Sequence, residues 1–322
     1  TDEKLDARLA EKVPAEVKKA IETQIIFGGN STTTTDDDIL AVQIDDTVSV
    51  SNDLSSYSLP ENNSIVRGEN DGAGSFSELQ AKIDNDDIGE LFLDKNYTYD
   101  DSSDSGLKNG IVISKDITIV GNGFTIDALS SARIFNITSG STVILNGINF
   151  VNGGGASVDY GGSIYSSAQG LAIYDCTFDG SYATEDGGAL FISGDGCKLY
   201  DSAFINNAAG DDGGAINWEG DYGTFNNIVI GPGCTFSGSF TYSGGIVGFG
   251  REVIIQNAAN YADMSNSSSL QESYTGGIIG YSEGSFLKQV FNMGDIDTTA
   301  ISGGIAGRLE LTDAADYNIV QL

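Results

Sequence analysis

The chain has 322 residues, of which 40% are hydrophobic, so it is long and apolar enough to bury a sizeable core. Its 15 basic residues are outnumbered by 46 acidic ones, and a net charge of -31 argues against nucleic acid and anionic membrane surfaces as partners. No run of 18 apolar residues occurs, so we expect no transmembrane segment.

The first 29 residues differ from all that follow. They hold five of the 15 basic residues, and apolar residues recur at a spacing of four from Leu5 to Ile25. This pattern predicts a helical arm over 1–29, or two short helices with Pro14 in a first-turn position. The arm could pack on its own body, dock on a neighbouring subunit or remain disordered.

Residues 30–74 are predicted to be a linker. Residues 30–37 are polar, the alternation from Ile39 to Val50 predicts one or two edge strands, and 51–74 is typical of loops.

A short helix is predicted over 75–84. Ser75 and Glu78 form a capping-box pattern, and Phe76, Leu79 and Ile83 fall on one helical face. An amphipathic helix before a repeat array is suited to covering the open end of that array.

A Gly-Gly pair followed by an apolar residue recurs six times, at steps of 26, 26, 31, 32 and 27 residues. A period of this size indicates a solenoid in which each repeat is one coil. The first glycines of the pairs are Gly161, Gly187, Gly213, Gly244, Gly276 and Gly303.

Each coil contains short alternating strands separated by Gly, Asn and Asp. Leu91-Phe-Leu93 and Ile117-Thr-Ile119 open two of the coils, and Cys176-Thr-Phe178 is an example of a second strand. This pattern predicts an all-β fold over 75–322, a parallel β-helix of about nine coils, and parallel crossovers are nearly always right-handed.

The repeat alignment also places the three cysteines. Cys176, Ser202 and Cys234 align in one inward column, so their thiols would be a whole coil apart, and Cys197 aligns with Leu171 on another strand. A disulfide needs Cα atoms within about 7 Å, so we predict three free, buried thiols.

Three known families share motifs with about two thirds of the chain. Leu91 to Ile216 resembles the adhesin-like surface proteins of methanogenic archaea and, more distantly, chlamydial polymorphic outer-membrane proteins, through Gly-Gly-Ala-Leu/Ile at 187–190 and 213–216, Phe-Ile-Asn-Asn at 204–207 and the opening at 117–124. Residues 244–307 are similar to GLUG-type repeats, through Gly-Gly-Ile-x-Gly at 244–248, 276–280 and 303–307. These resemblances imply secreted, right-handed β-helical proteins displayed on the cell surface.

Acidic clusters are the only candidates for chemistry. Asp211-Asp212, with Asp186 one coil earlier, could be turn residues, weak calcium ligands or a catalytic pair. With no histidine in the chain and few cations in the coils, we expect no enzyme and no cofactor beyond structural calcium, with Asp186 and Asp212 as its ligands. The clusters at 36–38, 84–87 and 100–104 are predicted to be solvated turns, with weak calcium sites as the alternative.

Surface contacts are predicted from two other patterns. Tyr174 and Tyr200 take equivalent outward positions on adjacent coils, either as a stabilising ladder or as a platform for sugar rings or a partner protein. Asn-x-Ser/Thr sequons, which are candidate glycosylation sites, occur at Asn30, Asn62, Asn96, Asn136 and Asn266.

We therefore expect an extracellular, cell-surface protein. The first hypothesis is a non-enzymatic, adhesin-like binding module that contacts surface glycans or proteins. The alternatives are a structural subunit of a sheath, S-layer or filament that contacts its own copies through the arm or the open ends of the β-helix, and a polysaccharide lyase or hydrolase.

Overall fold

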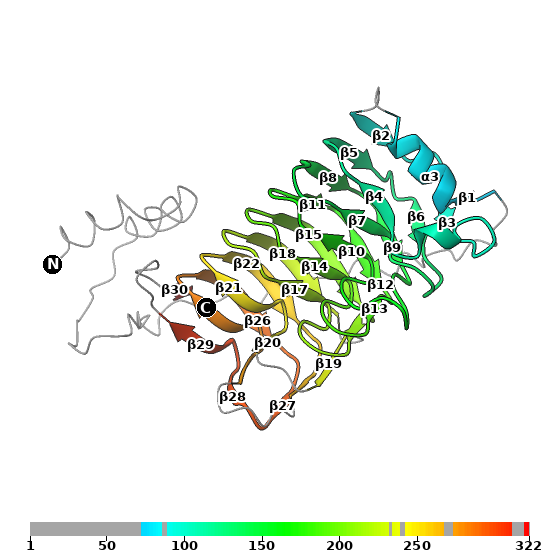
Figure 1. The fold of residues 1–322 in the computed structure, drawn as a ribbon. Coiled ribbons are helices and arrows are strands. Elements are labelled where there is room, and N and C mark those ends of the chain that lie inside the picture. The colour runs from blue at the N-terminus through cyan, green and yellow to red at the C-terminus, as the bar shows by residue number, and fades with distance from the viewer. Residues whose placement is uncertain are drawn as a thin grey trace, which may run out of the picture.

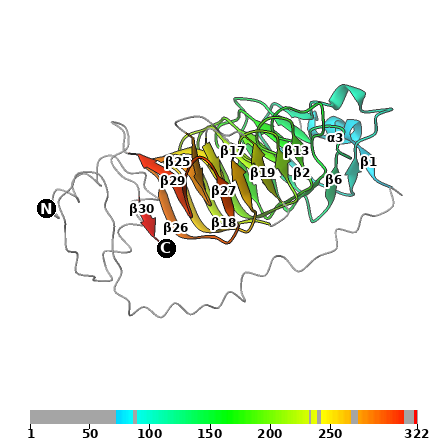
Figure 2. The ribbon, with the colours of Figure 1, turned by 90° about the horizontal axis from the view of Figure 1, so that it is seen from below.

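The computed structural model describes residues 72–85, 89–231, 234–238, 242–266, 273–310 and 319–321. They form a right-handed parallel β-helix, as the sequence predicted, with about eight turns where the sequence predicted about nine (Figures 1 and 2). The ninth predicted coil is represented by β30 (Ile319–Gln321), which pairs with the preceding turn. The predicted arm at 1–29 and the predicted strands between 39 and 50 lie outside the described residues.

Helix α3 (Phe76–Ile83) covers the first turns of the stack, as Figure 1 shows. The Ser75 side chain caps it by accepting a hydrogen bond from the backbone N–H of Glu78. Phe76, Leu79 and Ile83 are buried and join the interior core. The prediction of an amphipathic helix at the start of the repeat array is therefore confirmed.

Asp104, which the sequence placed in a solvated turn, is instead fully buried, just before the 3₁₀ helix η2 (Ser105–Leu107). Its carboxylate accepts hydrogen bonds from the backbone N–H groups of Phe76 at 3.0 Å, Ser77 at 2.9 Å and Asp100 at 2.9 Å. The first N–H groups of a helix have no partner within the helix, and negative charge is favourable there. Burial raises the pKa of Asp104, but the hydrogen bonds outweigh this effect and hold the pKa below its usual value.

The largest sheet, sheet A, has 14 strands in two runs that meet in β15, and all of its strand pairs are parallel. At the bend between the runs, Asp175, Asp201 and Asn227 have φ of 50°, 50° and 57°, a conformation that Asp and Asn tolerate. One run contains β2 (Glu90–Phe92), β5 (Ile117–Val120), β8 (Val143–Asn146), β11 (Ala172–Tyr174), β15 (Lys198–Ile205), β18 (Thr224–Ile230), β22 (Ile254–Asn260), β26 (Phe286–Asn292) and β30, and the other contains β1 (Gly74–Ser75), β3 (Tyr97–Thr98), β6 (Thr125–Asp127), β9 (Asn149–Val151) and β12 (Thr177–Asp179).

Four smaller parallel sheets complete the turns. Sheet B contains β4 (Ile111–Ile113), β7 (Phe135–Ile137), β10 (Ile164–Ser166), β14 (Leu190–Ile192) and β17 (Ile216–Trp218). Sheet C contains β13 (Tyr182–Ala183), β16 (Ala208–Ala209), β19 (Thr235–Gly238), β23 (Met264–Asn266) and β27 (Ile296–Thr298). Sheet D contains β21 (Val247–Arg251), β25 (Ile279–Glu283) and β29 (Ala306–Glu310), and sheet E contains β20 (Tyr242–Gly244), β24 (Tyr274–Gly276) and β28 (Ile301–Gly303).

A ladder of phenylalanine rings runs through the interior. Phe150, Phe178 and Phe204 are register partners on successive turns and are fully buried. Their rings stack at centroid distances of 4.7 and 4.8 Å with interplanar angles of 4° and 6°. Parallel pairing in register thus places identical side chains on top of one another.

The Gly-Gly pairs also stack from turn to turn. Gly244, Gly276 and Gly303 are register partners, and the Gly162 N–H donates to the Gly188 carbonyl at 3.1 Å. A Cβ atom on Gly188 would lie 2.2 Å from a backbone oxygen of the next turn. Close backbone approach therefore explains why glycine recurs at this place.

All three cysteines are free and buried, as predicted, but the predicted column of Cys234 is wrong. Cys176 does precede Ser202, whose register partner on the next turn is Ile228. Cys234 instead follows Asn207, and the Asn207 amide lies 3.8 Å from the Cys234 sulfur. The alignment failed here because it placed the extra residues of this longer coil before Cys234, whereas the step from Ala208 to its register partner Thr235 is 27 residues, one more than the 26 from Ser202 to Ile228.

Candidate functional site

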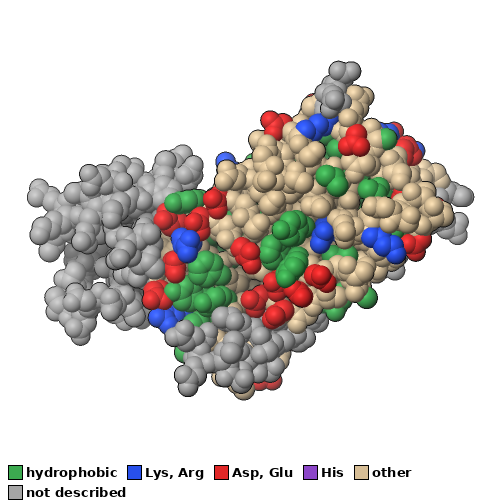
Figure 3. All heavy atoms as spheres, viewed as in Figure 1, with side chains coloured by type: hydrophobic (Ala, Val, Ile, Leu, Met, Phe, Trp, Pro, Cys, Tyr) green, Lys and Arg blue, Asp and Glu red, His purple; other side chains and the backbone are tan. Residues whose placement is uncertain are grey.

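One long face of the rod, formed by sheets B, D and E, carries two groups of aromatic side chains. Figure 3 shows two apolar patches on this face, one over β10 and β14 and one over β21 and β25, with acidic side chains between them. We call them the first aromatic cluster (Tyr160, Tyr165 and Phe191) and the second aromatic cluster (Tyr242, Phe249, Tyr274 and Tyr281).

The first aromatic cluster is built around a buried arginine. Tyr165 and Phe191 are register partners, and their rings stack 5.3 Å apart. The Arg133 guanidinium lies 5.3 Å from the Tyr165 ring centroid, which is a cation–π contact. Its nitrogens also donate to the backbone carbonyls of Tyr160 and Gly161, at 2.7 and 3.1 Å. The Arg133 charge is therefore engaged within the protein.

The second aromatic cluster joins rings of successive turns. Phe249 and Tyr281 stack at 5.4 Å, and Tyr242 and Tyr274 stack at 6.2 Å. Tyr242 and Phe249 are partly exposed, whereas Tyr274 and Tyr281 are buried. The cluster thus offers two accessible rings on a packed base.

Two arginines border the second aromatic cluster, and carboxylates neutralise both. Arg251 makes ion pairs with Asp221 at 3.3 Å and with Glu283 at 3.0 Å. Arg308 makes an ion pair with Glu310 at 3.1 Å. The guanidinium groups of both arginines are therefore paired with carboxylates of the protein itself.

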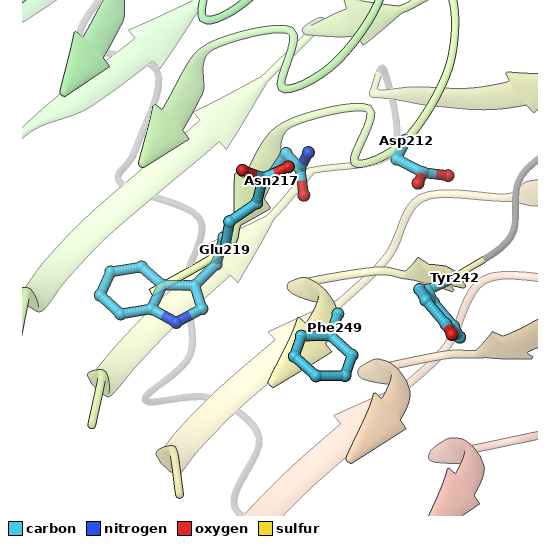
Figure 4. Close-up of a pocket in the computed structure, with 6 residues that line it drawn as sticks. Asp212, Asn217, Glu219, Tyr242 and Phe249 are labelled. Carbon is cyan, nitrogen blue, oxygen red and sulfur yellow. The ribbon is translucent and has the colours of Figure 1, made fainter. Parts of the chain in front are cut away.

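A hollow of about 410 Å³ lies between the two clusters, where β17 meets β21. Side chains alternate along a strand, so Asn217 projects to the outer side of β17, and Glu219, which directly follows the strand, lines the same hollow. Asn217 is also the register partner of Phe191, so the hollow adjoins the first aromatic cluster. Figure 4 shows Tyr242 and Phe249 across the hollow from Glu219. The lining consists of Asp212, Asn217, Trp218, Glu219, Tyr242 and Phe249.

Asn217 is the most informative residue of this lining. It is only 6% exposed, yet its side-chain amide makes no hydrogen bond with any other group in the part of the chain that the structure describes. An amide offers two donor hydrogens and an acceptor oxygen, and a polar ligand in the hollow could use them. An unpaired amide that lines a hollow therefore favours a polar ligand there.

The carboxyl groups beside the hollow are electrostatically crowded. The pKa of Asp186 is raised to about 6, mainly by burial and also by the nearby Asp211 and Glu219, against a hydrogen bond from the Asp212 N–H that lowers it. Burial also raises the pKa of Asp211 and of Glu219. The folded protein thus brings acidic groups close together here, and this makes the ionisation of their carboxyl groups less favourable.

The structure brings the two predicted calcium ligands together on adjacent turns. The backbone N–H of Asp212 donates to Asp186 Oδ1 at 2.8 Å. Calcium takes about six to eight oxygen ligands. Among the described residues, no three Asp, Glu, Cys or His side chains are grouped so that they could hold a metal ion. Asp186 and Asp212 therefore supply two carboxylates, and no third Asp or Glu among the described residues is grouped with them to hold a calcium ion.

The sequons occupy different environments. Asn30 and Asn62 lie outside the described residues. Asn96 is exposed, and Asn136 is half-buried in β7. Asn266 is buried, and its Nδ2 donates to two hydroxyl groups at 3.2 and 3.0 Å, so the folded chain leaves no space for a glycan on this amide.

Tyr174 and Tyr200 stack as the sequence alignment predicted. They are register partners on β11 and β15, with ring centroids 5.4 Å apart and an interplanar angle of 19°. Both belong to sheet A, so they do not contribute to the hollow.

The sequence analysis did not identify Asn217, Glu219 or the second aromatic cluster. A signal for that cluster existed, because tyrosine stands two residues before Gly-Gly in both Tyr242-Ser-Gly-Gly and Tyr274-Thr-Gly-Gly. No comparable signal existed for Asn217, whose surroundings depend on how β21 follows β17.

In comparisons with protein-family models, curated proteins and solved structures, no match to this chain was found. Within the described residues, no helix has both the length and the apolar character needed to cross a membrane.

Proposed function

We propose that this protein is a secreted, non-enzymatic surface protein that binds glycans, in the manner of an adhesin, through the hollow between its two aromatic clusters. The observation that carries the proposal is the amide of Asn217, which has no hydrogen-bond partner among the described residues and lines a hollow walled by accessible aromatic rings. The resemblance to archaeal adhesin-like proteins and to GLUG-type repeats points to the same class of function.

The chemistry of the hollow suits a sugar. A sugar ring presents C–H groups that pack on aromatic faces, here those of Tyr242 and Phe249. Its hydroxyl groups both donate and accept hydrogen bonds, so they match the amide of Asn217 and the carboxylate of Glu219. Binding sites of this size commonly combine an apolar wall with a few polar groups that fix orientation.

The test is a glycan array probed with the intact protein and with two double variants. Tyr242→Ala/Phe249→Ala removes the two accessible rings of the hollow. Tyr174→Ala/Tyr200→Ala removes a ring stack of the same kind from sheet A and serves as the matched control. We expect glycan binding by the intact protein and the control, and its loss in the hollow variant, with both variants shown to be folded by circular dichroism.

Other outcomes of the array would contradict the proposal. Binding that disappears only in the Tyr174→Ala/Tyr200→Ala variant would assign recognition to sheet A. The absence of binding to any glycan would remove the adhesin-like function. Cleavage of a bound polysaccharide that is lost in Asp186→Asn would support an enzyme instead.

A structural subunit of a layer or filament is the second candidate, because apolar side chains are exposed on the last described turns. Met293 is 67% exposed, Ile301 is 54% exposed, and Phe291 and Leu309 are each at least 40% exposed. Ile301 on β28 and Leu309 on β29 belong to strands that contact one another, and they offer apolar surface that a second copy of the chain could cover.

Electron microscopy and sedimentation of the purified protein test this second candidate. Regular polymers that are abolished by Met293→Lys/Ile301→Lys would support it. A particle that stays monomeric at high concentration would exclude it.

A further inference from the structure

The Glu219 carboxylate, which lines the hollow, makes no ion pair with any other described residue. Of the four basic residues after Arg133, Arg251 and Arg308 are engaged by carboxylates, as described above. The other two, Lys198 and Lys288, belong to β15 and β26 of sheet A. The charged neighbours that act on Asp186 are all acidic, namely Asp211, Glu219 and Glu185.

Elsewhere on the same face, each aromatic cluster already contacts a cation. Arg133 lies over Tyr165 in the first cluster, and Arg308 lies 5.2 Å from the Tyr274 ring in the second. Arg251 lies 5.7 Å from the ring centroid of Phe249, so of the two accessible rings of the hollow Phe249 already contacts a cation. The hollow between them is lined by rings and carboxylates but by no basic side chain. Rings and carboxylates together form the environment in which proteins hold ammonium groups.

The amide of Asn217 narrows the chemistry of the ligand. A simple inorganic cation would satisfy carboxylates but not the amide hydrogens of a residue that is 6% exposed. A ligand that carries hydroxyl groups beside a positive charge satisfies both Asn217 and Glu219. An amino sugar has this combination on one ring.

We propose that the hollow binds a protonated amino sugar within a glycan chain, with its ammonium group beside Glu219, its hydroxyl groups on Asn217 and its ring against Tyr242 and Phe249. This inference rests on the proposed glycan-binding function and adds the charge of the ligand to it. It requires the free amine, since N-acetylation removes the positive charge and leaves the rest of the sugar ring in place.

The experiment is calorimetric titration of the intact protein with two oligosaccharides of equal length, glucosamine trisaccharide and its fully N-acetylated counterpart, at a pH where the amine is protonated. We expect the amine form to bind at least about tenfold more tightly. In Glu219→Gln, the affinity for the amine form should fall by about threefold to tenfold, while any affinity for the acetylated form stays unchanged. In Asn217→Ala, binding of the amine form should weaken as well, since the amide contacts hydroxyl groups.

Glu90→Gln is the matched control variant. Glu90 is exposed on β2 at the opposite end of the rod, so this change removes the same charge from the same side chain far from the hollow. It should bind the amine form as the intact protein does. Equal losses in Glu90→Gln and Glu219→Gln would show that only the overall charge attracts the ligand, and would overturn the proposal.

Two further outcomes separate this inference from the function on which it rests. If the acetylated trisaccharide binds as tightly as the amine form, the inference is wrong while glycan binding stands. Trilysine carries the same number of side-chain ammonium groups without a sugar ring. If it binds as tightly and with the same dependence on Glu219, the hollow is a site for basic peptides, and both the inference and the glycan-binding function fail.

Discussion

The turns before residue 231 stack aromatic rings both inside the β-helix and on its outer faces, whereas the aromatic contacts described between 242 and 310 lie on the outer face. In the earlier turns, phenylalanine rings stack inside the β-helix and are fully buried. In the later turns, tyrosine and phenylalanine rings cluster on the outside, around sheets D and E. The same parallel stacking that consolidates a core in one region builds an outer aromatic cluster in the other.

The two regions also differ in how completely they are buried. Strand β12 in the earlier region pairs on both sides and buries Phe178 completely. Strands β27, β28 and β29 near the end of the described turns have no fully buried residue. Since each turn of a solenoid is stabilised by its neighbours, the earlier region should hold most of the stability of the protein.

The largest expected effect comes from breaking the interior ladder. Phe178→Ala removes a ring that stacks on two others, and it should lower the free energy of unfolding by about 4 kcal/mol. The matched change Phe249→Ala, in the half-buried outer cluster, should cost only about 1 kcal/mol. Chemical denaturation of both variants measures the difference. Equal losses would contradict the division into an inner stabilising ladder and an outer binding surface.

A second comparison uses one position of the repeated Gly-Gly motif in both regions. In Gly188→Ala the added Cβ would meet backbone oxygens at 2.2 and 2.4 Å, so we expect a loss of about 3 kcal/mol or more. In Gly304→Ala the Cβ has no atom within 4 Å, and stability should change by less than about 0.5 kcal/mol. Thermal unfolding of the pair is the measurement, and a large loss in Gly304→Ala would show that a further turn packs on this glycine.

The capping of α3 gives a third, smaller effect. Asp104→Ala leaves the N–H groups of Phe76 and Ser77 without their acceptor, which should cost about 2 kcal/mol at pH 7. The folded state lowers the pKa of this carboxyl below 3.8, so its contribution is present above that pH and is lost as the pH falls further. The gap between the intact protein and the variant should therefore narrow in acid, and a gap that is constant with pH would exclude this role of the carboxylate.

The repeat period was enough to predict the β-helix, because parallel pairing in register forces equivalent residues into columns. Phe150, Phe178 and Phe204, and likewise Tyr174 and Tyr200, lie where the alignment of Gly-Gly pairs placed them. The cap at Ser75 followed equally from local sequence, because its hydrogen bond spans only three residues.

What could not be predicted depends on contacts between turns of unequal length. Cys234 was misplaced because the steps change from 26 to 31 residues at that point. Asp104 was taken for a solvated turn because its partners in α3 are 27 and 28 residues away. The hollow forms where the period changes, between β17 and β21, and no local pattern marks the unpaired amide of Asn217.

The smallest expected effect concerns the junction between the two regions, and its sign is opposite to that at Asp104. Asp186 is partly exposed. Its pKa is raised from 3.8 to about 6, mainly by burial and to a smaller extent by Asp211, Glu219 and Glu185. A carboxyl whose pKa is raised on folding stabilises the folded state most below pH 3.8, and this stabilisation is lost as the pH rises through about 6. Asp186→Asn removes the unfavourable charge and keeps an oxygen to accept the Asp212 N–H, so at pH 7 it should stabilise the protein by about 1 kcal/mol after allowance for solvent screening. Unfolding measured at pH 7 and below pH 3.8 tests this expectation, since the gain should disappear in acid. A variant that is destabilised at pH 7 would mean that a bound cation neutralises the crowded carboxylates of the intact protein. The negative charge at this junction would then stabilise the fold, and the contrast with the apolar core would no longer hold.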